Sequence, residues 1–159
     1  MRYDSYIKYA NELRRLIGTP SALAMMSVAA VRAHRRKNTG HANKYVPSNA
    51  YIFDQFKRRE EIEALRQVYG RLFISISIYS DRKRRNLKLA EKISLGHSDA
   101  RTTKEHEHVA SDLIIRDENE DGVQSGQRLR DAFPLADLFI NIDNIESAKI
   151  GKYVLDLAR

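Results

Sequence analysis

Cysteine is absent from this chain of 159 residues. Its absence excludes a disulfide framework, a thiolate zinc site, a cysteine nucleophile and an iron–sulfur cluster. Glycine is also sparse, at seven residues, and none of them stands in a G-x-x-x-x-G-K-[ST] phosphate loop. The chain therefore lacks the sequence signature with which P-loop enzymes hold nucleotide phosphates.

Long apolar runs are missing as well. The longest, 22–31, covers ten residues and contains a serine, so it is too short to span a bilayer. The N-terminal segment 1–15 is charged throughout and does not resemble a secretory signal. We expect no membrane partner and a cytoplasmic location.

The net charge of +7 is unevenly distributed along the chain. Residues 1–92 hold 20 Lys and Arg against 8 Asp and Glu, or +12, whereas residues 93–159 hold 8 against 13, or −5. A basic half favours contact with phosphates, nucleic acid or an acidic partner. The alternative is a solvated surface whose two halves attract each other within one fold, and the composition favours neither.

Hydrophobic periodicity predicts helices that alternate with strands. Helices are expected over residues 1–17, 21–36, 57–69, 81–93, 104–115, 127–133 and 145–157, the second of them buried on nearly every side. Strands are expected over 50–56, 72–79 and 137–142, and loops at about 38–49, 94–103 and 117–126. This order predicts a single α/β domain over residues 1–159, with a layered, mostly parallel sheet flanked by helices.

The sequence gives little support for a metal site or for a catalytic nucleophile. His106 and His108 lie two residues apart, so on a helix they point to different sides, whereas a helical zinc pair needs i, i+4 spacing. The favoured interpretation is a solvated, charged start of a helix. No catalytic residue and no metal ligand is assigned.

Two segments carry candidate phosphate-binding side chains. Asp54 lies in the predicted strand 50–56, where a strand-end carboxylate can orient Mg²⁺ in P-loop phosphotransferases, although a capping or surface role is the alternative. Arg82, Arg84 and Arg85 follow the predicted strand 72–79, which we expect to be buried. Ligands of open α/β sheets bind beyond the carboxyl ends of the strands.

The three arginines are unfavourably placed for the helix that they begin. Cations in a first helical turn oppose the helix dipole, so we expect an anion to compensate them. Two sources are equally plausible: a phosphate of a bound nucleotide, or the acidic stretch Asp117, Glu118, Glu120 and Asp121 of the same chain. The alternative is an ordinary basic first turn without a ligand.

Several of these segments together resemble a known family. The run AYIFDQFKRREEIEALRQVYGRLFISISIYSDRKRRN at 50–86 looks like the second half of a P-loop module of the nucleoside-monophosphate-kinase type. An R-D-E-x-E stretch at 116–120 is followed by G-Q-x-x-R-D-x-F-P-L-A-D-x-F-I at 126–140. Over nearly its whole length the chain resembles the N-terminal kinase-like domain of bacterial antiphage deoxycytidylate/dCTP deaminases.

This resemblance implies a regulatory or nucleotide-sensing module whose ligand is a nucleotide with Mg²⁺ and whose partner is a deaminase domain or chain. The family's glycine-rich loop and its strand, which lies centrally between the strands that 50–56 and 72–79 resemble, are not among the 159 residues. The zinc deaminase signature H-x-E…P-C-x-x-C is not among them either. We therefore expect an incomplete kinase-like domain without deaminase catalysis: a fragment, an internal-start product or part of a split protein.

Two other functions remain open. The first is a protein-interaction module that binds no nucleotide. The second is a basic nucleic-acid-binding protein, suggested by the stretch RAHRRKNTGHANK at 32–44. Only Tyr45 stands next to that stretch to stack on bases, which is little for a single-strand binder, and no helix-turn-helix signature is seen.

Overall fold

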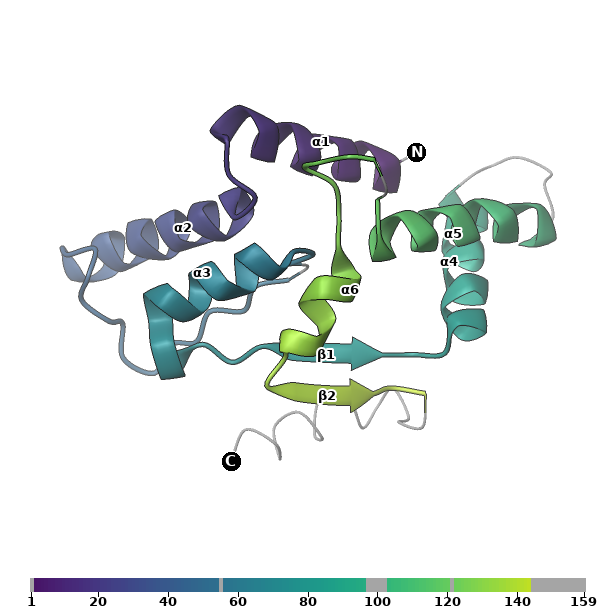
Figure 1. The fold of residues 1–159 in the computed structure, drawn as a ribbon. Coiled ribbons are helices and arrows are strands. Elements are labelled where there is room, and N and C mark those ends of the chain that lie inside the picture. The colour runs from purple at the N-terminus through teal and green to yellow at the C-terminus, as the bar shows by residue number, and fades with distance from the viewer. Residues whose placement is uncertain (1, 55, 97–102, 121, 144–159) are drawn as a thin grey trace. The chain divides into compact units, whose positions relative to one another are not determined.

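A computed structural model describes residues 2–54, 56–96, 103–120 and 122–143 of the chain (Figure 1). The chain divides into two compact units. The first unit comprises residues 1–73 and 116–135, and the second comprises 74–115 and 136–159. The sheet lies in the second unit, and each unit has its own group of buried residues.

The first unit is helical in its described part. It contains α1 (Arg2–Ile17), α2 (Ala22–Thr39), α3 (Arg59–Tyr69), the 3₁₀ turn η1 (Gly70–Leu72), α6 (Leu129–Ala132) and the 3₁₀ turn η2 (Phe133–Leu135). Apolar spacing predicts the first three helices to within three residues at either end. α2 ends at Gly40, whose φ of 78° lets its N–H reach the Arg36 carbonyl at 2.9 Å.

α2 differs from its expected burial. Ala22, Ala24 and Val31 are buried, but Met25 and Met26 are 55% and 48% exposed. The helix contacts α1 and α3, so one face is covered and the rest meets solvent. The expectation of burial on nearly every side is therefore wrong, because Ala and Met favour a helix whether or not it is covered.

The predicted strand over 50–56 is also wrong. Residues 50–54 and 56 have no regular secondary structure. A strand requires a neighbour for its backbone hydrogen bonds, and in the described part of the chain β1 and β2 pair only with each other. The segment lies along α2 instead, where the Tyr51 hydroxyl contacts His34.

The second unit holds the sheet. β1 (Ile76–Tyr79) and β2 (Leu138–Asn141) are parallel, as expected, and both are shorter than the predicted strands. Of the predicted strand 72–79, the first residue belongs to η1 and only the last four residues pair with β2. α4 (Arg82–Gly96) packs on α5 (Thr103–Glu118) through a small apolar cluster of Ala90, Ile93 and Ala110. The expected α/β class is confirmed as a mixed helical chain with a small parallel sheet.

β1 is more exposed than its sequence suggests. Ile76, Ile78 and Tyr79 are 43%, 60% and 48% exposed, whereas Ile140 of β2 is 3% exposed. The expectation of a buried strand is wrong for β1, because β-branched residues favour an extended backbone without determining which face is covered. The helix predicted over 145–157 lies outside the described residues.

Three helices extend further toward the C-terminus than predicted, which shortens the loops that follow them. α2 runs to Thr39, α4 to Gly96 and α5 to Glu118, so each of the three predicted loops begins later than expected. Among the described residues no single helix has the length and apolarity to cross a membrane, although α1 and α2 taken together, bent by 85°, pass on those two criteria.

Candidate functional site

The three candidate arginines begin α4 at the point where β1 ends. Arg82, Arg84 and Arg85 belong to the first turn of this helix. Because β1 and β2 run parallel, their carboxyl ends lie at the same edge of the sheet (Figure 1). Residues that follow both strands therefore meet beside this turn.

Asp143, which follows β2, is the residue that contacts the first turn of α4. Its Oδ1 accepts a hydrogen bond from the Ser80 hydroxyl at 2.6 Å, and its Oδ2 accepts one from the Asp81 backbone N–H at 2.5 Å. Arg84 Nη1 donates to the Asp143 carbonyl at 2.6 Å. The Ser80 hydroxyl, then the Asp81 amide and the charges of Arg84 and Lys88, hold the pKa of the Asp143 carboxyl below its usual value.

Asp81 caps the helix from its own side. Its Oδ1 accepts the backbone N–H groups of Lys83 at 2.9 Å and Arg84 at 3.4 Å. Of the two polar residues that precede α4, Ser80 and Asp81, it is Asp81 that caps the helix. Two carboxylates therefore offset the dipole and the arginines of this turn.

The acidic stretch expected to face the arginines has other partners. Asp117 pairs with Lys57 at 2.9 Å, and Glu118 with Arg130 at 3.4 Å. These contacts lie within the first unit. Glu120 pairs with Arg116 at 2.6 Å, and Asp121 lies outside the described residues. The anion that faces Arg84 within the second unit is Asp143.

Asp54 is an exposed carboxylate of the first unit, in the segment without regular structure. The three arginines belong to the second unit. Within the described residues no group of three or more His, Asp and Glu side chains is arranged to hold a metal ion. A single exposed carboxylate gives Mg²⁺ no defined coordination geometry here.

The two histidines of α5 do point to different sides. His106 is 2% exposed, whereas His108 is exposed and lies 3.2 Å from Asp112. The expected divergence of the pair is therefore confirmed. The expectation of a solvated helix start is wrong for His106.

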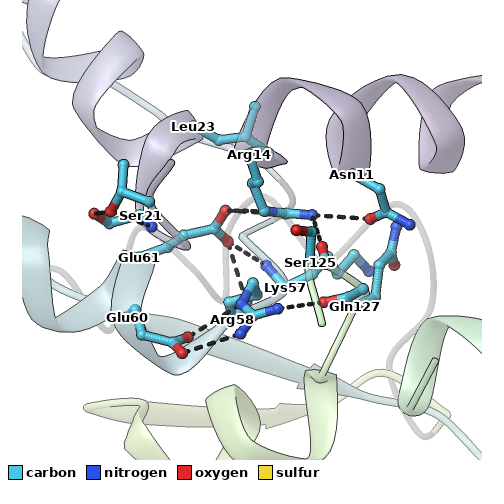
Figure 2. A network of polar contacts seen from close by, with 12 residues as sticks. Asn11, Arg14, Ser21, Leu23, Lys57, Arg58, Glu60, Glu61, Ser125 and Gln127 are labelled. Atoms are coloured by element: carbon cyan, nitrogen blue, oxygen red, sulfur yellow. Dashed lines mark hydrogen bonds and ion pairs between the residues drawn. The ribbon is translucent and has the colours of Figure 1, made fainter. Parts of the chain in front are cut away.

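Sequence reasoning missed a buried polar network in the first unit (Figure 2). The Glu61 carboxylate is fully buried and accepts the backbone N–H groups of Lys57 at 2.9 Å and Arg58 at 3.1 Å. It also accepts Nε and Nη2 of Arg14 at 3.3 and 3.0 Å. Glu61 is the third residue of α3 and reaches back to the Arg58 backbone N–H, but Arg at the N-cap position is not a capping-box residue, so the sequence carried no signal for this contact.

The same network ties α3 to the segment before α6. Arg58 is 3% exposed and donates to the backbone carbonyls of Gln124 at 3.0 Å and Gly126 at 2.7 Å. Arg58 also pairs with Glu60 at 3.1 Å, and this hydrogen bond holds the pKa of Glu60 below its usual value. These groups satisfy one another, so the network positions backbone segments and presents no reactive group.

Comparisons with protein families, with curated proteins and with solved structures give no match to this chain. The resemblance to the kinase-like domain of antiphage deaminases therefore stays a prediction. Any functional assignment depends on the geometry described above.

Proposed function

We propose that this chain is a nucleotide-sensing, kinase-like module of a bacterial antiphage dCTP/dCMP deaminase system. It acts in the cytoplasm and carries no deaminase catalysis of its own, so deamination belongs to another domain or chain. The observation that supports this proposal is the anion-holding arrangement at the carboxyl ends of β1 and β2. There the Ser80 hydroxyl and the Asp81 amide donate to the Asp143 carboxylate, while Arg84 donates to the Asp143 main-chain carbonyl at 2.6 Å and lies 3.5 Å from the carboxylate.

A phosphate can use the same donors as this carboxylate. Phosphate oxygens accept hydrogen bonds from hydroxyl, amide and guanidinium groups, and those to a charged partner are the strong ones. A nucleotide phosphate would therefore compete with Asp143 for these donors, while Arg82 and Arg85 add positive charge to the same turn. In the free protein Asp143 supplies the anion, and its displacement is the signal that a sensor needs.

The second candidate function is protein interaction, favoured by the exposed apolar side chains of β1. Ile76 and Ile78 lie on the same face of the strand and are 43% and 60% exposed. Exposed apolar patches mark interaction surfaces. This function needs no nucleotide, so nucleotide binding distinguishes the two candidates.

The test combines Arg82→Ala with Arg85→Ala and measures thermal unfolding with a panel of dNTPs. A dNTP that binds raises the melting temperature of the parent protein. The double variant should lose affinity by about 1–3 kcal/mol relative to the parent, each affinity being taken from the shift in that protein's own melting temperature. The matched control, Arg71→Ala with Lys92→Ala, removes the same charge outside the first turn of α4 and should bind like the parent.

Two results would contradict the proposal. One is a parent protein whose melting temperature no dNTP raises. The other is a double variant that binds each dNTP as tightly as the parent, because the two arginines then contribute nothing to binding. Repeating the affinity measurement at two salt concentrations shows how much of the binding is electrostatic.

A further inference from the structure

An open groove lies between α2 and the segment that was expected to be a strand. Its volume is about 420 Å³, and it is lined by Ser27, Ala30, Val31 and His34 of α2 and by residues 49–53. Tyr51 is fixed in this groove, because its hydroxyl pairs with His34 Nδ1 at 2.9 Å and the two rings meet edge to face at 5.5 Å. The groove therefore holds an aromatic ring in a defined position.

A guanidinium group lies between this ring and a second tyrosine. The Arg35 guanidinium carbon is 5.7 Å from the Tyr51 ring centre and 6.0 Å from that of Tyr69, both within the cation–π range. Arg35 Nε and the Tyr69 hydroxyl are buried and have no hydrogen-bond partner among the described residues. Burial raises the pKa of the Tyr69 hydroxyl.

The chain around the groove carries charge of one sign. Residues 13–53 contain no Asp or Glu, and within them residues 19–53 hold five basic side chains: Arg32, Arg35, Arg36, Lys37 and Lys44. Arg32 and Arg36 are exposed and lie one helical turn apart on α2. No acid of this segment is present to neutralise them, so the surface is complementary to a polyanion.

We propose that this groove and its basic rim bind single-stranded nucleic acid. Arg32 and Arg36 contact the phosphates, and a base stacks against Tyr51 in the groove. The sequence offered only Tyr45 beside the basic stretch, whereas the fold adds Tyr51 and Tyr69. A basic groove with aromatic side chains is how sequence-tolerant single-strand binders are built.

The occupant is a strand and not a duplex or a mononucleotide. A base must leave its stack to reach a ring held in a groove, which single strands allow and duplexes resist. Cations on two successive turns match several phosphates of one backbone, where a mononucleotide offers phosphate at a single point. This site lies in the first unit and does not rest on the nucleotide site proposed beside α4.

The charge test uses fluorescence anisotropy with the full chain and a labelled oligo(dT) of about 10 nucleotides, over a series of salt concentrations. Arg32→Ala with Arg36→Ala should weaken binding and reduce the slope of log affinity against log salt by about 0.7 for each phosphate that the variant no longer neutralises. The matched control, Arg59→Ala with Arg71→Ala, removes the same charge from exposed positions outside the groove and should keep the parental slope.

The stacking test compares two substitutions of Tyr51. Tyr51→Leu keeps an apolar side chain but removes the ring, and should weaken oligo(dT) binding by about tenfold or more. Tyr51→Phe removes only the hydrogen bond to His34 and keeps the ring, so its affinity should stay close to that of the parent. Thermal melts establish that both variants are folded.

Five results would overturn the proposal. The parent chain fails to bind oligo(dT) at low salt, or the two double-arginine variants lose affinity equally, which indicates bulk charge alone. Tyr51→Leu binds like the parent, which indicates phosphate contact without stacking. A duplex of the same length binds as well as the single strand. Finally, dTMP displaces the strand at a similar concentration, which indicates a mononucleotide site.

Discussion

The buried ion pair of the first unit and the exposed strand β1 of the second contrast in which side chains they cover. In the first unit Arg14 and Glu61 are 2% and 0% exposed, while in the second unit Ile76 and Ile78 of β1 are 43% and 60% exposed. A buried ion pair is tolerated only when further hydrogen bonds complete it, as the backbone groups around Glu61 do. Burial here therefore follows the supply of partners more closely than residue type.

The two charge halves of the sequence meet within the first unit. Lys57 belongs to the basic half and Asp117 to the acidic half, yet they are 2.9 Å apart. Asp4 and Arg116 repeat this pairing across the chain with the signs reversed. The asymmetry of net charge is thus partly neutralised inside the fold, and it leaves the acid-free stretch around α2 as the strongly basic part of the first unit.

The largest effect should come from breaking the buried pair of the first unit. Arg14→Met leaves the Glu61 carboxylate buried without its cation, which costs about 3–5 kcal/mol of unfolding free energy. Urea unfolding measures this loss. Arg15→Met is the matched control on the same helix, because Arg15 forms an exposed pair with Glu12 that is worth about 0–1 kcal/mol.

The double variant Arg14→Met with Glu61→Leu sharpens the same comparison. It removes both charges, so part of the stability lost in the single variant should return, while the Lys57 and Arg58 N–H groups that lose their acceptor limit the recovery. If the Arg14→Met variant unfolds at the same urea concentration as the Arg15→Met variant, the buried network does not contribute to stability.

The next largest effect on stability should come from a comparison of an exposed residue of β1 with a buried residue of β2. Ile78 and Ile140 are paired in register on the same face, but Ile78 is 60% exposed and Ile140 is 3% exposed. Ile140→Ala should cost about 2–5 kcal/mol, whereas Ile78→Ala should cost less than about 1 kcal/mol. Urea unfolding of both variants is the measurement, and equal losses would mean that β1 is covered in the folded protein.

The helices were the most predictable part of this fold. The apolar spacing of residues 1–17 and the turn at Gly70 are local signals, and both correspond to helix ends in the structure. Strands were less predictable, because a strand exists only where a neighbour pairs with it. Residues 50–56 and 72–79 both read as strands, yet only the C-terminal half of the second has a partner.

The candidate site shows the same division between local and distant information. The order of segments in the sequence was enough to predict that a helix follows a strand here and begins with Arg82, Arg84 and Arg85. The partner of Arg84 could not, because Asp143 is 59 residues away and reaches the turn only through the parallel pairing of β1 and β2. Chain order alone pointed to the acidic stretch, which the first unit uses elsewhere.

The smallest effect on stability should come from Asp143. This residue contributes one carboxylate to the second unit, whereas the first unit has a dense polar network. The folded protein holds the pKa of this carboxyl below the value of 3.8 that applies to the unfolded chain. A lowered pKa contributes stability that is present above the unfolded pKa and is lost as the pH falls through the folded one. Asp143→Asn should therefore be less stable than the parent at neutral pH, and the difference should disappear on acidification below 3.8.

Urea unfolding over a pH series measures this difference, and Ser80→Ala is the informative control. The Ser80 hydroxyl is the main cause of the lowered pKa, so removing it should shrink the acid-side change while leaving the carboxylate in place. If the loss of unfolding free energy in Asp143→Asn is the same at every pH, ionisation of this carboxyl contributes nothing to stability. The turn would then be held by shape alone, and the charge of Asp143 would not help it to compete with a phosphate.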